Sequence, residues 1–133
     1  VCGDGQQPPF EGPFDAVFVD APCTGLGTLR RHPDIKWRLS SDSPAEMSAI
    51  QKGLLRMALK LCKNQGLVVY SVCTFTAEET EAVIAPLIEE GLVAPENGPD
   101  WLNAWKVATG TYQTLPSLHG LDGFYLTRLR KLS

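Results

Sequence analysis

Two cysteines stand where a reactive thiol could do chemistry. Cys23 lies three residues after Asp20, in the segment VFVDAPCTGLGTLRRHPDIKW, and Cys73 follows a second apolar run. A thiolate is a good nucleophile, and nearby positive charge or a helix N-terminus favours it over the thiol. A neighbouring carboxylate can accept a hydrogen bond or move a proton. The most specific interpretation of these residues is therefore that both thiols are catalytic and that Asp20 lies beside them.

The same thiols could instead bind a metal or form a disulfide. Two ligands are too few for zinc, and the sequence contains neither a C-x-x-C pair nor histidines at zinc spacing. No stretch approaches the roughly 20 apolar residues of a membrane span. We therefore expect no metal and no membrane contact, and, without a secretory signal, a cytoplasmic protein. We expect four reduced thiols: Cys2, Cys23, Cys62 and Cys73.

Positive charge is concentrated directly after Cys23. The whole chain has 12 Lys and Arg against 15 Asp and Glu, and its net charge of −3 argues weakly against a dedicated nucleic-acid binder. A local basic surface can nevertheless bind phosphate on an acidic protein. The alternative to a phosphate-binding surface is an ordinary solvent-exposed loop of charged residues. The basic residues of this loop are Arg30, Arg31, Lys36 and Arg38.

Two apolar runs predict the strands that carry the thiols. Residues 14–19 and 67–71 are short and almost continuously apolar, which is typical of parallel strands covered on both faces. Between them, Ser43 opens an S-x-x-E capping box, and Gly66 ends the predicted helix. Its apolar stripe consists of Met47, Ile50, Leu54, Ala58 and Leu61.

This order of elements predicts where the thiols meet. A strand–helix–strand crossover is right-handed, so the two strands are expected to be neighbours about 4.8 Å apart. Functional groups of such sheets collect at the carboxyl ends of the strands. Cys23 follows the first strand and Cys73 follows the second. The pattern therefore predicts both thiols at one edge of the sheet, beside Asp20.

The remaining sequence predicts a second helix and two more strands. Thr76 and Glu79 form a further capping box, and Pro86 should kink the helix that follows. Residues 101–107 are expected to form a third strand, and residues 124–130 alternate well enough for a last strand. Alternating strands and helices indicate an α/β fold with a mostly parallel sheet.

Two segments resemble the catalytic core of the RNA cytosine-carbon-5 methyltransferases: DAPCTGLGTLRRHPDIKW and GLVVYSVCTFTAEETEAVI. The nearest group is the bacterial small-subunit ribosomal RNA methyltransferase B, Fmu or Sun family. The resemblance implies a Rossmann-like, S-adenosylmethionine-dependent fold with an antiparallel last strand. Because the chain starts at Val1, and the family's glycine-rich loop and ribose-binding acid would precede it, residues 1–133 are expected to be the C-terminal part of one catalytic domain.

The resemblance implies a role for each reactive residue. Cys73 matches the nucleophile of the RNA enzymes, and Cys23 matches the thiol that assists product release. Asp20 would accept a hydrogen bond from the exocyclic amine of cytosine. S-adenosylmethionine would be contacted by Asp4, Asp20 and Pro22. The RNA backbone, with 16S ribosomal RNA as the expected substrate, would be bound by Arg30, Arg31, Lys36 and Arg38.

The implied reaction explains the need for a thiolate. Carbon 5 of cytosine is a poor nucleophile, and addition of a thiolate to carbon 6 makes an enamine that can accept a methyl group. The carbon-5 proton then leaves and the thiol is expelled. We expect the helix capped by Thr76 to favour the Cys73 thiolate through its N-terminal field. Val72 departs from the family pattern, which has threonine before this cysteine.

Other classes of function remain as alternatives. A cysteine phosphatase spaces its cysteine and arginine one residue closer than Cys23 and Arg30, and no histidine stands directly before Cys23. A non-catalytic RNA-binding module, or an inactive fragment of a methyltransferase, stays open. The presence of both thiols and Asp20 argues against a decayed site.

Overall fold

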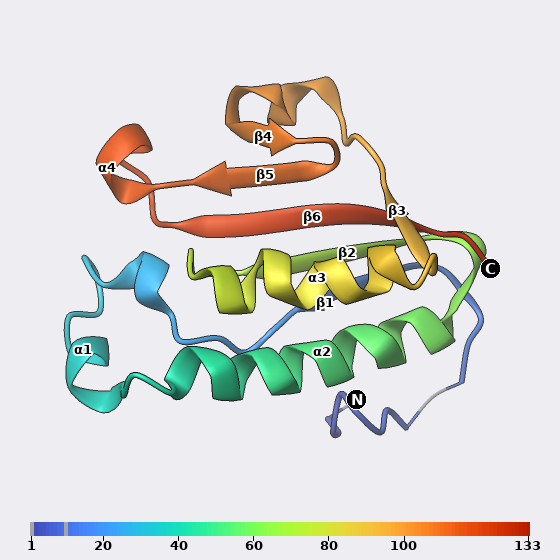
Figure 1. Ribbon diagram of the computed structural model, residues 1–133, viewed down its shortest axis with the longest axis horizontal. Coiled ribbons are helices and arrows are strands. Elements are labelled where there is room, and N and C mark those ends of the chain that lie inside the picture. The colour runs from blue at the N-terminus through green and yellow to red at the C-terminus, as the bar shows by residue number, and fades with distance from the viewer. Residues whose placement is uncertain (1, 10) are drawn as a thin grey trace.

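The computed structural model describes residues 2–9 and 11–133 and contains one sheet (Figure 1). The strands are β1 (Phe14–Asp20), β2 (Cys62–Val72), β3 (Val93–Pro95), β4 (Lys106–Ala108), β5 (Thr111–Thr114) and β6 (Phe124–Lys131). The helices are α1 (Ile35–Arg38), α2 (Ser43–Leu61), α3 (Glu81–Glu89) and α4 (Pro116–His119). Single 3-10 segments cover Leu26–Thr28, Ala77–Glu79 and Asp100–Trp105.

The sheet confirms the predicted neighbours. The strand order is β1-β2-β6-β5-β4, and β3 pairs with β6. β1 and β2 are parallel and end together, with Asp20 opposite Ser71. The last strand, β6, is antiparallel to β2 as expected, and the other described pairings are also antiparallel. The parallel part of this Rossmann-like sheet is therefore the β1–β2 pair, which carries the thiols.

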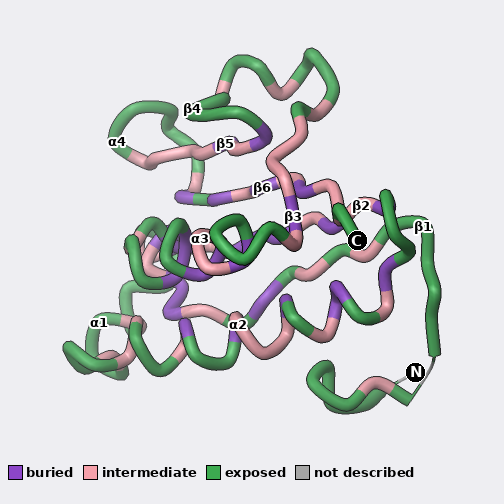
Figure 2. The backbone as a smooth tube through the Cα atoms, turned by 45° about the vertical axis from the view of Figure 1, so that its right-hand side comes forward, coloured by how far each residue is buried: buried purple, intermediate pink, exposed green. Residues whose placement is uncertain are grey.

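Helices α2 and α3 lie side by side on one face of the sheet (Figures 1 and 2). The buried face of α2 differs from the predicted stripe: Ile50 is 37% exposed, whereas Gln51 is fully buried. Gln51 is tolerated inside because its side-chain amide donates hydrogen bonds to Pro22 O and to the buried carboxylate of Glu79. The side chains that α2 buries are Ser48, Gln51, Leu55, Ala58 and Leu59.

β1 is less covered than its apolar run predicts. It forms one edge of the described sheet, and Phe18 is 62% exposed. Val17 and Val19, on the opposite face, pack against the core. The expectation of a strand covered on both faces was wrong for the described residues, because α2 covers only the face that carries the valines.

Two predicted boundaries were also wrong. α2 ends at Leu61, and β2 starts at Cys62 through an irregular register, so residues 62–66 are strand and not helix. Residues 100–105 form a 3-10 segment, in which Leu102 N–H donates to Pro99 O, and Trp101 is 71% exposed. Only the short β4 remains of the predicted third strand, because only that part reaches β5.

Neither predicted capping box forms. The residue that precedes the first turn of α2 is Asp42, and Ser43 Oγ instead accepts a hydrogen bond from Ser40 N–H. The helix predicted to start at Thr76 is divided into a 3-10 turn and α3, which meet at Thr80. The division occurs because the carboxylate of Glu79 turns into the protein interior, where it has other partners.

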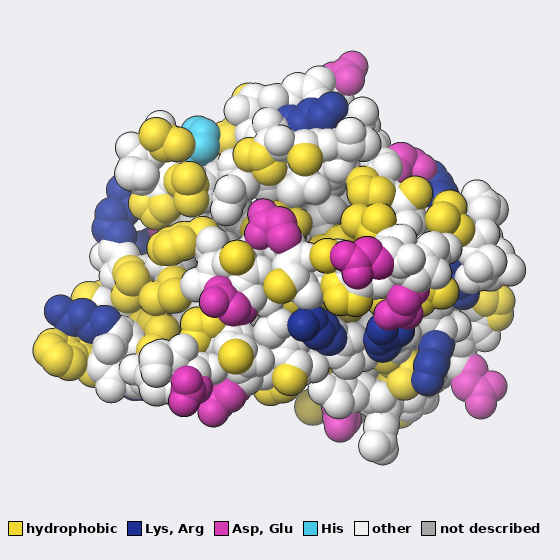
Figure 3. Space-filling model, viewed as in Figure 1, with side chains coloured by type: hydrophobic (Ala, Val, Ile, Leu, Met, Phe, Trp, Pro, Cys, Tyr) yellow, Lys and Arg dark blue, Asp and Glu magenta, His cyan; other side chains and the backbone are white. Residues whose placement is uncertain are grey.

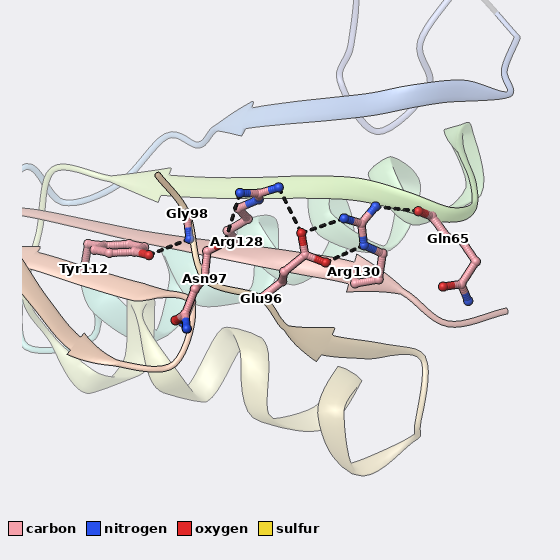
Figure 4. Close-up of polar contacts among 8 residues, drawn as sticks. Gln65, Glu96, Asn97, Gly98, Tyr112, Arg128 and Arg130 are labelled. Carbon is pink, nitrogen blue, oxygen red and sulfur yellow. Dashed lines mark hydrogen bonds and ion pairs between the residues drawn. The ribbon is translucent and has the colours of Figure 1, made fainter. Parts of the chain in front are cut away.

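A charged cluster links strands of the sheet at a site far from the thiols (Figure 4). Glu96 accepts hydrogen bonds from the guanidinium groups of Arg128, at 2.9 Å, and Arg130, at 2.6 Å. Arg130 also donates to Gln65 O, and Arg128 donates to Asn97 O. This Glu96 cluster, defined as Glu96, Arg128 and Arg130, joins the segment after β3 to β6 and to the start of β2.

The described residues contain neither a membrane-spanning helix nor a group of metal ligands. No described helix has the length and apolar character that crossing a membrane requires. Within residues 2–9 and 11–133, no three His, Cys, Asp or Glu side chains lie together as candidate metal ligands.

Candidate active site

The two thiols meet at the carboxyl ends of β1 and β2. Cys23 Sγ and Cys73 Sγ are 3.1 Å apart, and both side chains are partly buried. The prediction that the two loops bring their thiols together is confirmed. The remaining cysteines lie elsewhere: Cys62 is in the core and Cys2 is exposed, and all four are free thiols.

Backbone hydrogen bonds hold the two thiol loops against each other. Ala21 N–H donates to Ser71 O, and Gly27 N–H donates to Cys73 O, both at 3.0 Å. Gly27 O in turn accepts from Gly123 N–H at 2.8 Å. A Cβ at residue 27 would lie only 1.9 Å from Gly123 O, so only glycine permits this approach.

The two thiols have opposite pKa shifts. The hydrogen bond from Cys23 is the largest influence on Cys73 and lowers the pKa of Cys73 to about 7. The same contact, together with burial, raises the pKa of Cys23. Cys73 is therefore the thiol that ionises first, and Cys23 keeps the proton that it donates. The helix expected to start after Thr76 starts later, because a 3-10 turn covers Ala77–Glu79 and α3 begins only at Glu81.

Asp20 ends β1 next to this pair. Its Oδ1 accepts a hydrogen bond from Ser71 Oγ at 2.7 Å, which fixes the carboxylate relative to β2. The carboxylate also raises the pKa of Cys73, as a smaller influence than the Cys23 thiol. The carboxylate therefore acts on Cys73 through its charge.

Two hollows meet at residues 20–23. The first has a volume of about 570 Å³ and runs between β1 and α2; all three predicted donor contacts, Asp4, Asp20 and Pro22, line it. The second, of about 540 Å³, contains both thiols. We call them the β1–α2 hollow and the thiol hollow. The segment from Asp20 to Cys23 borders both, so groups bound in the two hollows would face each other across it.

The predicted basic residues are not all equivalent. Arg38 lines the thiol hollow and pairs with Asp34 at 2.8 Å. Lys36 places its ammonium 4.7 Å from the centre of the Trp37 ring. Arg30 donates to Gly120 O, and Arg31 pairs with Asp122, so these two tie the loop to the segment before β6.

The surface around these residues is partly apolar. Acidic and basic side chains are interspersed over the face that α2 and α3 cover, whereas hydrophobic side chains gather at the end with α1 and α4 (Figure 3). Trp37 is 81% exposed there, and Leu118 is 74% exposed. The thiol hollow therefore opens near a surface that offers both positive charge and exposed apolar groups.

One buried carboxylate beneath the thiols was missed from the sequence. Glu79 is fully buried, and its Oε1 accepts from Thr24 N–H at 2.8 Å and Gln51 Nε2 at 3.1 Å. Its Oε2 accepts from the hydroxyls of Thr24, Thr74 and Thr76, at 2.6, 3.1 and 2.9 Å. We call these five residues the Glu79 cluster. The capping-box pattern concealed it; the signal was polar Gln51 on the helix face that also carries Leu55, Ala58 and Leu59.

Comparisons with known proteins agree with this geometry. A sequence profile of the family described as "16S rRNA methyltransferase RsmB/F" matches residues 1–130. Ribosomal RNA small subunit methyltransferase B of Thermus thermophilus is 40% identical over 119 residues, which cover 88% of this chain and 29% of the relative. Ribosomal RNA small subunit methyltransferase F of Aeromonas salmonicida is 37% identical over 123 residues, which cover 89% and 26%.

A solved structure shows the same fold. NSun6 from Pyrococcus horikoshii, solved with SFG, matches with a TM-score of 0.85 at 26% identity, over 100% of this chain and 34% of that one. This agreement confirms the predicted Rossmann-like methyltransferase fold. The chain spans less than a third of the length of the two curated relatives described above. On the evidence of the profile match and these relatives, the chain belongs to the RsmB/F family of 16S rRNA methyltransferases.

Proposed function

We propose that the protein carrying this chain methylates carbon 5 of a cytosine in 16S ribosomal RNA, with S-adenosylmethionine as donor and Cys73 as covalent nucleophile. The observation that carries the proposal is the pair of thiols, 3.1 Å apart at the ends of two parallel strands, in a chain that belongs to an rRNA methyltransferase family. In this proposal residues 1–133 are the C-terminal part of the catalytic domain.

Cys73 begins the reaction as a thiolate, which its pKa of about 7 makes available near neutral pH. The Cys73 Sγ–carbon 6 bond forms, and the electrons of the carbon 5–carbon 6 double bond move towards carbon 5. Asp20, fixed through Oδ1 by Ser71, uses Oδ2 to accept a hydrogen bond from the cytosine amine. Carbon 5 thereby becomes nucleophilic while the base is held in place.

Cys23 acts when the base is released. Once carbon 5 carries the methyl group, a water molecule accepts its proton, the electrons of that C–H bond restore the double bond, and the Cys73 Sγ–carbon 6 bond breaks. The departing sulfur takes the electron pair, and the S–H group of Cys23 can stabilise it by donating a hydrogen bond. The raised pKa of Cys23 keeps this proton in place. Cys23 is therefore assigned to product release.

The β1–α2 hollow fits the donor. Ile50, Leu54 and Met57 provide apolar walls, and the carboxylate of Asp4 provides a hydrogen-bond acceptor, while Asp20 lines the same hollow. A flat purine with an amino group needs this combination. S-adenosylmethionine supplies the methyl group from its sulfonium. The NSun6 neighbour, solved with SFG, supports this choice of cofactor.

The thiol hollow is assigned to the target cytosine. Chemistry on a base requires that the base leaves its stack, and a hollow with both thiols on its wall can receive it. Arg38, on the same wall, is assigned to an RNA phosphate, and Arg30, Arg31 and Lys36 to the backbone on either side. Binding should therefore weaken as the salt concentration rises.

Methyl transfer to unmodified 16S rRNA tests the proposal. In the full-length protein, Cys73→Ala should abolish transfer to carbon 5, read by bisulfite sequencing, whereas the control Cys2→Ala should retain it because Cys2 lies outside both hollows. The alternative, a non-catalytic RNA-binding module, predicts that the wild type binds this RNA without methylating it. That result would overturn the proposed function.

A further inference from the structure

Glu79 connects the residues that directly follow the two thiols. Thr24 comes after Cys23, and Thr74 comes after Cys73. The hydroxyls of both threonines donate to the same carboxylate oxygen, Oε2, at 2.6 and 3.1 Å. One carboxylate oxygen therefore contacts both thiol loops, directly after each thiol.

Glu79 is also held from β2 and from α2. Tyr70 OH, from inside β2, donates to the Glu79 carbonyl oxygen at 2.7 Å. Gln51, from α2, donates to Glu79 Oε1 at 3.1 Å and to Pro22 O at 2.9 Å. Pro22 directly precedes Cys23, so the same anchor holds the first thiol loop from both sides. The backbone of Glu79 is thus held by β2, and its carboxylate is held by α2 while it contacts the two loops.

We propose that Glu79 is a positioning residue that sets the separation of Cys23 and Cys73. The consequence for catalysis rests on the function proposed above, whereas the consequence for thiol geometry does not. Glu79 is fully buried and lines neither the thiol hollow nor the β1–α2 hollow, so it does not touch the substrate. It acts through Thr24 and Thr74.

The chemistry of the cluster explains why a carboxylate is required. Five hydrogen bonds reach the two oxygens of Glu79, and every partner donates. A carboxylate can accept all five. A glutamine of the same shape carries an NH2 group in place of one oxygen, and this group would face the N–H and O–H donors of Thr24 or its neighbours, so that donor would meet donor. Glu79→Gln should therefore loosen the loops without leaving a cavity, and Glu79→Asp, which keeps the acceptors, should restore part of the geometry.

Thiol–disulfide exchange measures the separation without requiring activity. In the full-length protein with Cys2→Ser, oxidised dithiothreitol takes two electrons from Cys23 and Cys73 and becomes the dithiol, while an S–S bond forms and two protons pass to the dithiol. The equilibrium constant reports the effective concentration of one thiol at the other. We expect Glu79→Gln to lower it at least tenfold, and the matched control Glu78→Gln, whose side chain is exposed, to leave it unchanged.

The variants are compared at a temperature where circular dichroism shows each of them folded. If Glu79→Gln does not fold, Thr74→Val, which removes one hydroxyl and keeps the shape, should still lower the constant about twofold to threefold. The proposal would be overturned if folded Glu79→Gln had the same exchange constant as the wild type. If Glu79→Gln does not fold, the same result for folded Thr74→Val would overturn it. A purely structural glutamate would lower the melting temperature and leave this constant unchanged.

Kinetics provide the second readout. Misplacing reacting groups by about 1 Å can reduce the rate about 10²-fold. We therefore expect Glu79→Gln to lower kcat by that order with little change in KM for RNA, and Glu79→Asp to recover part of kcat. If the wild type proves inactive on RNA, the proposed function fails, and the exchange constant alone then decides the role of Glu79.

Discussion

The Glu79 cluster and the Glu96 cluster use the same residue type to join distant segments, but with different partners. Glu79 is fully buried and accepts only from hydroxyl, amide and backbone N–H groups. Glu96 has a third of its side chain exposed and accepts from the two guanidinium groups of its cluster. The first lies beneath the thiols, and the second lies at the far end of β6.

The difference follows from what each region must do. In the partly exposed Glu96 cluster, ion pairs are tolerated because water can solvate the charged groups that the pairs do not fully neutralise. Beneath the thiols, the charge of Glu79 raises the pKa of Cys73 as a smaller influence than the Cys23 thiol, and neutral donors satisfy this carboxylate without placing a cation beside the thiols. The largest influence on Cys73 is accordingly a neutral thiol and not a cation.

The largest expected effect concerns folding stability. Glu79→Ala should reduce the free energy of unfolding by about 3 kcal/mol, because it leaves several buried donors without an acceptor. Glu96→Ala should cost about 1 kcal/mol or less, because its arginines can be solvated. Urea unfolding of the two variants measures both values. Equal losses would contradict the contrast between the clusters.

The next effect concerns the thiols themselves. The rate of Cys73 alkylation by iodoacetamide, followed by mass spectrometry of the Cys73 peptide, should rise with a midpoint near pH 7. In Cys23→Ala the stabilising hydrogen bond is lost, so the midpoint should move towards the ordinary value of 9.0. At pH 7 the rate should then fall by about one order of magnitude or more. An unchanged midpoint would mean that something other than Cys23 favours the thiolate.

The smallest effect is the pH dependence of the Glu96 cluster. Hydrogen bonding to Arg130 lowers the pKa of Glu96 below its ordinary value of 4.5. The ionised carboxylate therefore stabilises the fold above that value, and this contribution is lost as the pH falls through the lower, folded pKa. Because the group is partly exposed, we expect the contribution to be less than about 1 kcal/mol. Wild type and Glu96→Gln, compared by urea unfolding between pH 6 and pH 3, should converge at low pH; a constant difference would contradict this.

The sequence predicted the elements whose signals are local. The two apolar runs and the helix between them were enough to place Cys23 beside Cys73, because a right-handed crossover leaves little freedom. The three residues assigned to the donor also line one hollow. The prediction that the thiols meet is confirmed because strand ends and loop starts are determined within a few residues along the chain, whereas donor binding by these three residues stays a prediction.

The Glu79 cluster could not be predicted in the same way. Its members come from α2 and from two loops, and their contacts span up to 55 residues along the chain. The spacing of Thr76 and Glu79 is also that of a capping box. In the structure the Glu79 carboxylate instead accepts hydrogen bonds from the threonine hydroxyls of its cluster, which the spacing does not reveal. Basic residues raise the same difficulty, because Arg30 and Arg31 look free for RNA in the sequence but contact the segment before β6.

The division of labour between the thiols is the central claim, and a covalent adduct tests it most directly. Full-length Cys23→Ala, incubated with 16S rRNA and S-adenosylmethionine, should accumulate a protein–RNA adduct that survives denaturing electrophoresis, because release from Cys73 is impaired. Mass spectrometry should place the nucleotide on Cys73, and Cys73→Ala should form no adduct. An adduct that still forms in Cys73→Ala would contradict the account.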